Sequence, residues 1–447
     1  MNKTTLCAAI VALLTASTGC LAAVSADEAA KLKTTLTPLG GERAGNKEGT
    51  IPAWDGKKSV AATPKAGDIP TNPFPGEKPL LQITAKNMAQ HADKLTDGTK
   101  ALLTKYPESF RLDVYPTHRT SVAPQYVYDN TLKNATNCKT KNEGNSVEGC
   151  YGGIPFPIPK AGAEAVWNYL LRVEAEATEV SFKNILVTSD GNRTLATHNE
   201  QVNQYPFYYK DGSLEKWSGE YFLQRFSTIA PPFKAGESLV IRDGVDAATP
   251  RQTWQYLVGQ RRVRRAPTVA YDTPDFVSSG ANYFDEVMGI MGHPDRYQWK
   301  LVGKKEIYVP YNSNALVTAK EEEFFTKAHA NPDKARWELH RVWEVEATVA
   351  AGKRHAVPKR RYYFDEDTWL LVLMDGYDSQ GKLWRTTQGY PYVVPAIPAV
   401  VIKPVTVFDL QKGTSSTVQF LDSFKVLPKR KPEIYFTGDA VAADASR

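Results

Sequence analysis

Cysteine and histidine are scarce in this sequence, with four Cys and seven His among 447 residues. The histidines are scattered and form no His-x-x-x-His or similarly close zinc-binding spacing. A Gly-x-Ser-x-Gly nucleophile motif and a glycine-rich phosphate loop are also missing. The sequence therefore lacks the common signatures of zinc hydrolases, of esterases and of nucleotide-binding enzymes. We therefore expect neither a metal nor a cofactor.

Long apolar runs are missing after the N-terminus, which excludes a bundle of membrane-spanning helices. At the start, Lys3 precedes an apolar run from Leu6 to Leu14, which is shorter than the ~20 residues that span a bilayer. Small residues follow, and Val24-Ser25-Ala26 fits the pattern that signal peptidase accepts. We predict that residues 1–26 are a signal peptide cleaved after Ala26, which places a soluble mature chain in the periplasm of a Gram-negative cell.

Two alternatives to this cleavage are a retained membrane anchor and lipid attachment at Cys20. The short apolar run argues against an anchor. Ser17-Thr18-Gly19 supplies small residues before Cys20, but a lipoprotein signal has Leu at the position of Ser17. We therefore expect no lipidation.

Removal of the signal peptide leaves two cysteines, Cys138 and Cys150, in a segment rich in Asn, Lys and Gly. In an oxidising compartment such a pair forms a disulfide that fixes a surface loop. The spacing is not Cys-x-x-Cys, so a redox role is not indicated. The net charge of +6 is small for this length and does not indicate nucleic acid binding.

The chain changes character near residue 160. Residues 27–160 read as an N-terminal arm with helices, packed on a main domain of residues 161–447. Helices are predicted over 84–105 and 164–173, whereas residues 108–160 look irregular and include a Pro-rich extended connector.

Beyond residue 175, alternation of apolar and polar residues dominates. In 337–349 the odd positions are mostly apolar and the even ones mostly charged, which indicates a strand with one wet face. Hairpins are predicted over 254–265, 297–309 and 360–374. Residues 391–408, apolar but broken by prolines, are predicted to be an edge strand and loop; a hydrophobic lip at a ligand site is the alternative. Together these segments predict a mainly β (α+β) fold with a large antiparallel sheet that curls or closes.

Several segments resemble one known family in the same order along the chain. They are Thr50-Ile51-Pro52-Ala53-Trp54, Val114-Tyr115-Pro116-Thr117, Gly153-Ile154-Pro155-Phe156-Pro157-Ile158-Pro159, Trp167-Asn168, Arg261-Arg262-Val263-Arg264, Val309-Pro310-Tyr311-Asn312, Asp365-Glu366-Asp367-Thr368-Trp369 and Tyr377-Asp378. The chain resembles a proteobacterial family of unknown function that is labelled as similar to outer-membrane lipoprotein-sorting proteins.

This resemblance implies the fold of the Lol lipoprotein carriers, an unclosed antiparallel half-barrel wrapped around a few helices with an apolar cavity between them. It also implies transport of hydrophobic material across the envelope. The implied partners are an inner-membrane exporter of the resistance-nodulation-division type and an outer-membrane protein. Both partners are implied by association rather than by mechanism.

Aromatic residues on predicted strands are the candidates for lining such a cavity, although aromatic side chains also dominate ordinary β cores. The candidates are Trp254, Tyr256, Trp299, Trp337, Trp343 and Trp369. Arg262 and Arg264 share one face of a strand and are candidates for a clamp on an anionic head group; a solvated edge strand is the alternative reading.

We predict a non-enzymatic periplasmic carrier of a lipid or another hydrophobic molecule. One alternative is a periplasmic hydrolase acting on polysaccharide or ester, for which Asp365, Glu366, Asp367 and Asp375 are the available carboxylates. These lie in predicted turns, where acidic residues are common. A second alternative is a non-enzymatic accessory subunit of an exporter.

Overall fold

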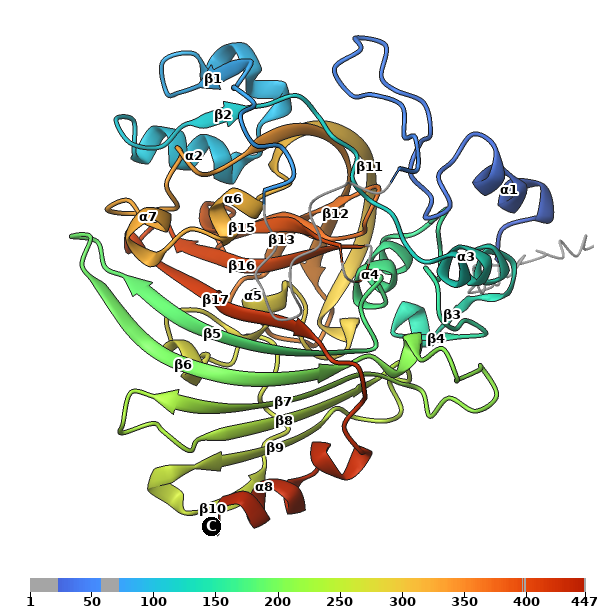
Figure 1. Ribbon diagram of the computed structural model, residues 1–447, viewed down its shortest axis with the longest axis vertical. Coiled ribbons are helices and arrows are strands. Elements are labelled where there is room, and N and C mark those ends of the chain that lie inside the picture. Colours follow the sequence, from blue (N-terminus) through green and yellow to red (C-terminus); the bar gives the residue numbers. More distant parts are fainter. Residues whose placement is uncertain (1–22, 58–71, 396, 398, 446–447) are drawn as a thin grey trace, which may run out of the picture.

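One large curved sheet dominates the computed structural model, which describes residues 23–57, 72–395, 397 and 399–445 (Figure 1). Within these residues fifteen strands join the sheet. They are β1 (Leu81–Ile83), β2 (Leu112–Val114), β5 (Ala177–Val187), β6 (Arg193–Gln204), β7 (Glu220–Ala230), β8 (Ser238–Gly244), β9 (Gln252–Leu257), β10 (Arg262–Arg265), β11 (Tyr297–Pro310), β12 (Trp337–Val349), β13 (Lys359–Asp365), β14 (Leu371–Tyr377), β15 (Leu383–Val394), β16 (Ala399–Asp409) and β17 (Thr414–Val426).

The sheet is built from two antiparallel meanders, β5 to β10 and β12 to β17. They are joined where the last strand, β17, pairs with β5. Strand β11 pairs with β12 beside the main path, and β2 adds a single parallel bridge between Val114 and Trp337. The path ends at β1 and β10 and does not close. The predicted large, curved, unclosed antiparallel sheet is confirmed.

Eight α-helices of the described residues pack around this sheet. They are α1 (Ala26–Ala30), α2 (Asp97–Lys105), α3 (Gln125–Asn137), α4 (Gly162–Leu170), α5 (Phe284–Met288), α6 (Asn314–Val317), α7 (Glu321–Phe324) and α8 (Gly438–Ala445). A further small sheet pairs β3 (Lys139–Lys141) with β4 (Ser146–Glu148). None of these helices is long and apolar enough to cross a membrane.

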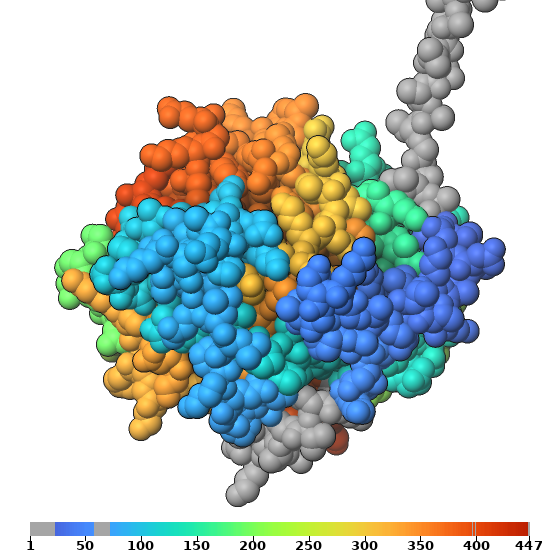
Figure 2. Space-filling view, turned by 90° about the horizontal axis from the view of Figure 1, so that it is seen from above, coloured from blue at the N-terminus to red at the C-terminus, as the bar shows by residue number. Residues whose placement is uncertain are grey.

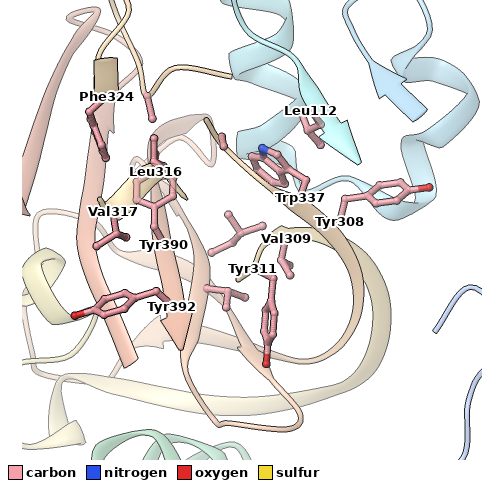
Figure 3. Packing of buried hydrophobic residues seen from close by; sticks show 14 of the residues in the cluster. Leu112, Tyr308, Val309, Tyr311, Leu316, Val317, Phe324, Trp337, Tyr390 and Tyr392 are labelled. Atoms are coloured by element: carbon pink, nitrogen blue, oxygen red, sulfur yellow. The ribbon is translucent and has the colours of Figure 1, made fainter. Parts of the chain in front are cut away.

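The largest hydrophobic core joins β11, β12 and β15 to α6 and α7 (Figure 3). Trp337 lies in it beside Phe110, with ring centroids 6.4 Å apart, and Phe324 meets Tyr390 edge-on. Residues 23–57 and 72–115 lie side by side across one end of the molecule (Figure 2). One prediction for β12 needs correction: the strand is present, but Glu338 and His340 on its charged side are 0% and 2% exposed, and the His118 amide donates to Glu338 at 2.8 Å.

Two helix predictions are wrong. The predicted helix over 84–105 divides at Leu95, which is extended, because the Thr96 hydroxyl accepts a hydrogen bond from the Thr99 amide and starts α2 anew. Residues 108–160 are not wholly irregular, because they contain α3. Its buried face includes Thr131 and Asn134, so the apolar periodicity that marks a helix is weak there. The predicted helix over 164–173 is present as α4.

Two strand predictions also need correction, whereas the hairpins over 254–265 and 360–374 are confirmed. Residues 297–309 form the single strand β11, because Gly303 makes a bulge and not a turn. Residues 391–408 are not an edge: they form parts of β15 and β16, deep inside the sheet order. The register of this pair shifts between Gly389 and Pro391, which is how the sheet accommodates proline.

The predicted disulfide between Cys138 and Cys150 is present and links the end of α3 to the residues after β4. Most of the predicted signal peptide, residues 1–22, lies outside the described residues. Ala26, the predicted cleavage position, is the first residue of α1, and Ser25 caps that helix. The predicted boundary at residue 160 stays a prediction; β1 and β2 from the N-terminal part join the same sheet as the rest.

Asp375 in β14 is fully buried at the start of α2, where it accepts hydrogen bonds from the Gly98 amide (3.0 Å) and the Thr386 hydroxyl (2.8 Å). Burial raises the pKa of Asp375 to about 6, and the two hydrogen bonds only partly oppose this shift. Between the unfolded pKa of 3.8 and about pH 6 the folded state therefore binds the extra proton, so this residue's contribution to stability falls as the pH rises.

Replacement of Asp375 with Asn, which resembles the protonated acid, is expected to remove this loss. Above pH 7 the variant should be more stable than the parent by on the order of 1–3 kcal/mol, and the difference should vanish near pH 4. Urea unfolding at pH 4, 6 and 8 measures it. The exposed Asp93→Asn variant is the control. A stability difference that does not change with pH would contradict the assignment.

Candidate functional site

Three small cavities lie between the inner face of the sheet and the segment from α5 to Met291. The first has a volume of about 40 Å³, and the second and third have about 30 and 20 Å³. The first two share Gln201, Gln224, Val287, Met288 and Gln419. The first and third share Tyr169, Arg172, Tyr205, Phe222 and Met288. The three cavities therefore adjoin one another, and we call them together the inner cavity and each of them a branch.

The second branch is mainly apolar. Its lining includes Phe182, Phe226, Leu239, Ile241, Val277, Phe284 and Met291. The first branch has a different character, because the charged Arg172, Glu174 and Lys403 and the amide of Asn203 line it in addition to the three glutamines that it shares with the second branch. Asn203 accepts hydrogen bonds from Gln201 (2.9 Å) and Gln224 (3.3 Å). The inner cavity thus has a polar end and an apolar end, an arrangement that suits an amphiphilic molecule.

Charged residues are concentrated at the polar end. Arg172 follows α4, Glu174 lies two residues later, and Lys403 comes from β16. Arg172 Nη2 lies 3.0 Å from Glu174 Oε1, and Lys403 Nζ donates to Gln419 Oε1 at 3.0 Å. Burial lowers the pKa of Lys403 to about 8, although Glu174 acts in the opposite direction. Burial likewise raises the pKa of Glu174, against the effect of Arg172 and Lys403.

The short helix α5 covers the inner cavity and is held by buried ion pairs. Asp285 accepts hydrogen bonds from Arg360 at 2.7 and 3.0 Å and lies 2.9 Å from His355 Nε2. Burial alone would raise the pKa of Asp285, but Arg360 and His355 outweigh it and hold the pKa below its usual value. The neighbouring Glu286 is bound by Arg385, whose Nη2 lies 2.8 Å from its carboxylate. Helix α5 is therefore anchored to β13 through Arg360 and to β15 through Arg385.

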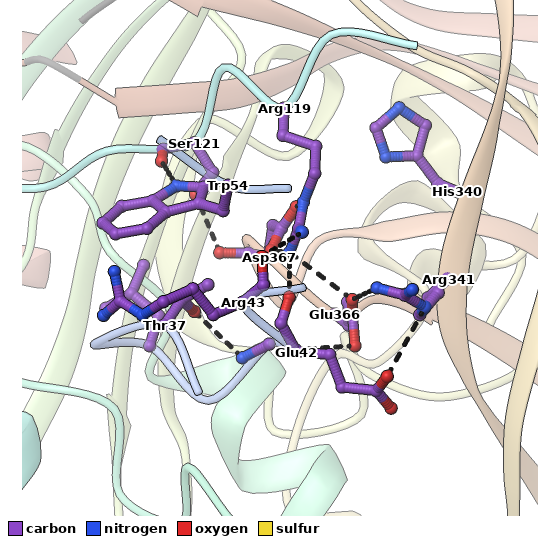
Figure 4. Close-up of polar contacts among 12 residues, drawn as sticks. Thr37, Glu42, Arg43, Trp54, Arg119, Ser121, His340, Arg341, Glu366 and Asp367 are labelled. Atoms are coloured by element: carbon purple, nitrogen blue, oxygen red, sulfur yellow. Dashed lines mark hydrogen bonds and ion pairs between the residues drawn. The ribbon is translucent and has the colours of Figure 1, made fainter. Parts of the chain in front are cut away.

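A second group of buried charges lies beneath the N-terminal arm (Figure 4). Arg119 donates to both carboxylate oxygens of Asp367, at 2.8 and 2.6 Å, and to the Glu42 carbonyl at 2.7 Å. Lys304 lies 2.8 Å from Glu366 and 3.1 Å from Glu42. These ion pairs join residues 36–54, which from here on we call the arm, to the turn after β13. We call this group of ion pairs the arm cluster.

The arm cluster accounts for the carboxylates considered for a hydrolase. Asp365, Glu366 and Asp367 are at most 2% exposed, and none lines the inner cavity. Burial, with Asp367 nearby, raises the pKa of Asp365 to about 7, but Tyr311 and Thr368 already donate hydrogen bonds to it. Asp375 supports α2. Glu366 and Asp367 therefore fasten residues 36–54, whereas Asp365 and Asp375 hold other parts of the fold, and the four carboxylates do not share one of these cavities.

None of the residues nominated from the sequence lines the inner cavity. Trp254 and Tyr256 pack in a cluster with residues of the C-terminal segment, and Trp299 packs against the core around α4. Trp337 is core, and Trp343 stacks on Trp369 with centroids 6.2 Å apart. Arg262 and Arg264 are exposed on the edge strand β10. The binding role of the nominated residues stays a hypothesis, and the structure does not bring these residues together at one site.

The charged residues of the inner cavity were not predicted from the sequence, because they lie next to or within apolar segments. Arg172 and Glu174 come directly after the apolar helix α4, where a change to charged residues reads as a surface loop. Lys403 carried a clearer signal, since it is the only charged residue between 391 and 408. A single Lys within so apolar a run marks a buried cation that requires partners.

Comparison with known proteins relates the chain to others without an assigned activity. The model of a family described as "Protein of unknown function (DUF1329)" matches residues 82–442. The uncharacterized protein PA3922 of Pseudomonas aeruginosa is 40% identical over 410 residues, which cover 90% of each chain.

Solved structures with a similar arrangement are more distant in sequence. A DUF1329 family protein from Desulfovibrio piger is 12% identical, with a TM-score of 0.42, over 62% of this chain and 95% of that one. A LolA superfamily protein from Nitrosomonas europaea is 11% identical, with a TM-score of 0.38, over 63% of this chain and all (100%) of that one.

Proposed function

Since the chain belongs to the DUF1329 family of proteins of unknown function, we propose from its own cavities that it is a non-enzymatic periplasmic carrier of a lipid or another hydrophobic molecule. The observation that carries this proposal is the inner cavity, which has an apolar branch and a polar end on the concave face of an unclosed sheet. As part of the same proposal, the carrier exchanges cargo with an envelope exporter and an outer-membrane protein, as the family resemblance implies.

The small volume of the inner cavity describes a closed state. A branch of about 40 Å³ holds a few water molecules, because each needs ~10–15 Å³ on this measure. An acyl chain can therefore enter the inner cavity only when helix α5, which covers the cavity, moves. The half-buried Val287 and Met288 of α5 line both of the first two branches, so displacement of this one short helix opens them together.

A bulky side chain placed in the cover tests this proposal. The purified parent should bind the neutral apolar dye N-phenyl-1-naphthylamine with enhanced fluorescence, and Val287→Trp should weaken this binding at least tenfold by filling the cavity. The control is Val302→Trp, at an exposed position of β11, which should bind like the parent. Thermal unfolding verifies that both variants are folded. A parent that binds no dye, or a Val287→Trp variant that binds normally, would refute the carrier.

A further inference from the structure

Arg172 has an unfilled hydrogen-bonding position inside the cavity. Its side chain is 8% exposed and its guanidinium lies 4.7 Å from the centre of the Tyr169 ring. Nη1 donates to the Tyr169 carbonyl at 2.9 Å and Nη2 pairs with Glu174, but the buried Nε has no partner among the described residues. A buried donor without an acceptor is costly, so this position favours a ligand oxygen.

The first branch of the cavity also has an excess of positive charge. Its charged lining residues are Arg172, Glu174, Glu286 and Lys403. Glu286 is occupied by Arg385, which leaves Glu174 alone to balance two cations. An anionic group bound between Arg172 and Lys403 would neutralise the surplus and supply the missing acceptor.

Glu174 also separates the cavity from an open groove. A groove of about 640 Å³ runs past Tyr126, Ala175 and Leu427, and Glu174 lines both this groove and the first branch. A second groove of about 540 Å³ continues from it and shares Tyr126 and Lys210. Among the described residues, Glu174 alone lines both the inner cavity and this groove, and its carboxylate pairs with Arg172.

We propose that Arg172 and Lys403 bind the anionic head group of an amphiphile that enters from this groove, and that Glu174 holds the entrance closed until the ligand displaces it. The ligand carries a carboxylate or a phosphate, and its apolar chain lies in the second branch. This inference rests on the proposed carrier function and specifies its cargo class and route of entry.

The experiment compares one probe with and without its charge, 11-(dansylamino)undecanoic acid and its methyl ester. The parent should bind the acid at least tenfold more tightly than the ester. Arg172→Met/Glu174→Gln and Lys403→Met should each lose at least tenfold in affinity for the acid and keep the parent affinity for the ester. Removing both members of the ion pair avoids a buried unpaired carboxylate. Glu174→Gln alone should bind the acid about tenfold more tightly and faster.

The matched control is Lys382→Met in the exposed turn between β14 and β15, which should not change either affinity. Displacement of the acid by decanoate assigns a carboxylate ligand, displacement by dihexanoyl phosphatidic acid assigns a phosphate, and displacement by neither overturns the head-group site. Equal affinities for acid and ester in the parent also overturn it and leave the carrier standing. Absence of binding of both probes and of the neutral dye refutes the carrier itself.

Discussion

Replacement of Arg119 with Met is expected to lower the free energy of unfolding by about 3–5 kcal/mol, because it leaves the carboxylate of Asp367 buried without its cation. Arg119 is 7% exposed and also donates to the carbonyls of Glu42 and Pro52. Its loss should therefore release the arm as well as the charge. Urea unfolding measures the free energy, and limited proteolysis should cut within residues 36–54 sooner than in the parent.

The double variant Arg119→Met/Asp367→Asn is the matched control for charge. It removes both members of the ion pair and should recover part of the lost stability, because a buried neutral amide costs less than a buried carboxylate. An Arg119→Met protein with parental stability and parental resistance to protease would show that the arm is held by its apolar contacts alone.

Replacement of Arg360 with Met should have a comparably large effect at the other buried cluster. Arg360 is 1% exposed and forms two hydrogen bonds with Asp285, so its removal leaves that carboxylate with His355 as its remaining ionic partner. We expect a loss of about 3–5 kcal/mol in the free energy of unfolding. Because Asp285 belongs to α5, hydrogen exchange should accelerate over residues 284–291, and the neutral dye should enter faster.

The neighbouring residue provides a control with the same chemistry. Arg361 is partly exposed, and its closest carboxylate contacts lie between 3.6 and 3.8 Å. Arg361→Met should therefore cost less than ~1 kcal/mol and leave dye entry unchanged. If Arg360→Met destabilises the protein without faster hydrogen exchange in α5, Asp285 contributes to stability but does not control the opening of α5 over the inner cavity.

Alternation in the sequence was sufficient to predict the sheet, because its strands keep a period of two even where both faces are buried. The strand at Trp337, the hairpin at Gly259 and the disulfide of Cys138 all follow from local patterns. The family resemblance then supplied the open edge of the curved sheet, which no single strand encodes.

The interior site could not be predicted in the same way. Arg172, Glu174 and Lys403 come from segments about 230 residues apart, and only the pairing of β17 with β5 brings these segments together. The even positions of β12 looked wet because the partners that bury them, such as His118 for Glu338 and Lys305 for Glu344, lie outside the sequence of the strand itself. Local patterns report which side chains are polar, but not what later covers them.

The arm that covers this sheet has a consequence for the order of folding. The Leu39 carbonyl accepts its hydrogen bond from Trp369, and the Glu42 amide donates to Glu366, across 330 and 324 residues of chain. Residues 36–54 therefore leave the ribosome long before the strands that receive them. Contacts this distant form late and slowly, so the arm completes the structure after the sheet has assembled. A chain truncated before β13 would retain its arm but have no surface on which to fasten it.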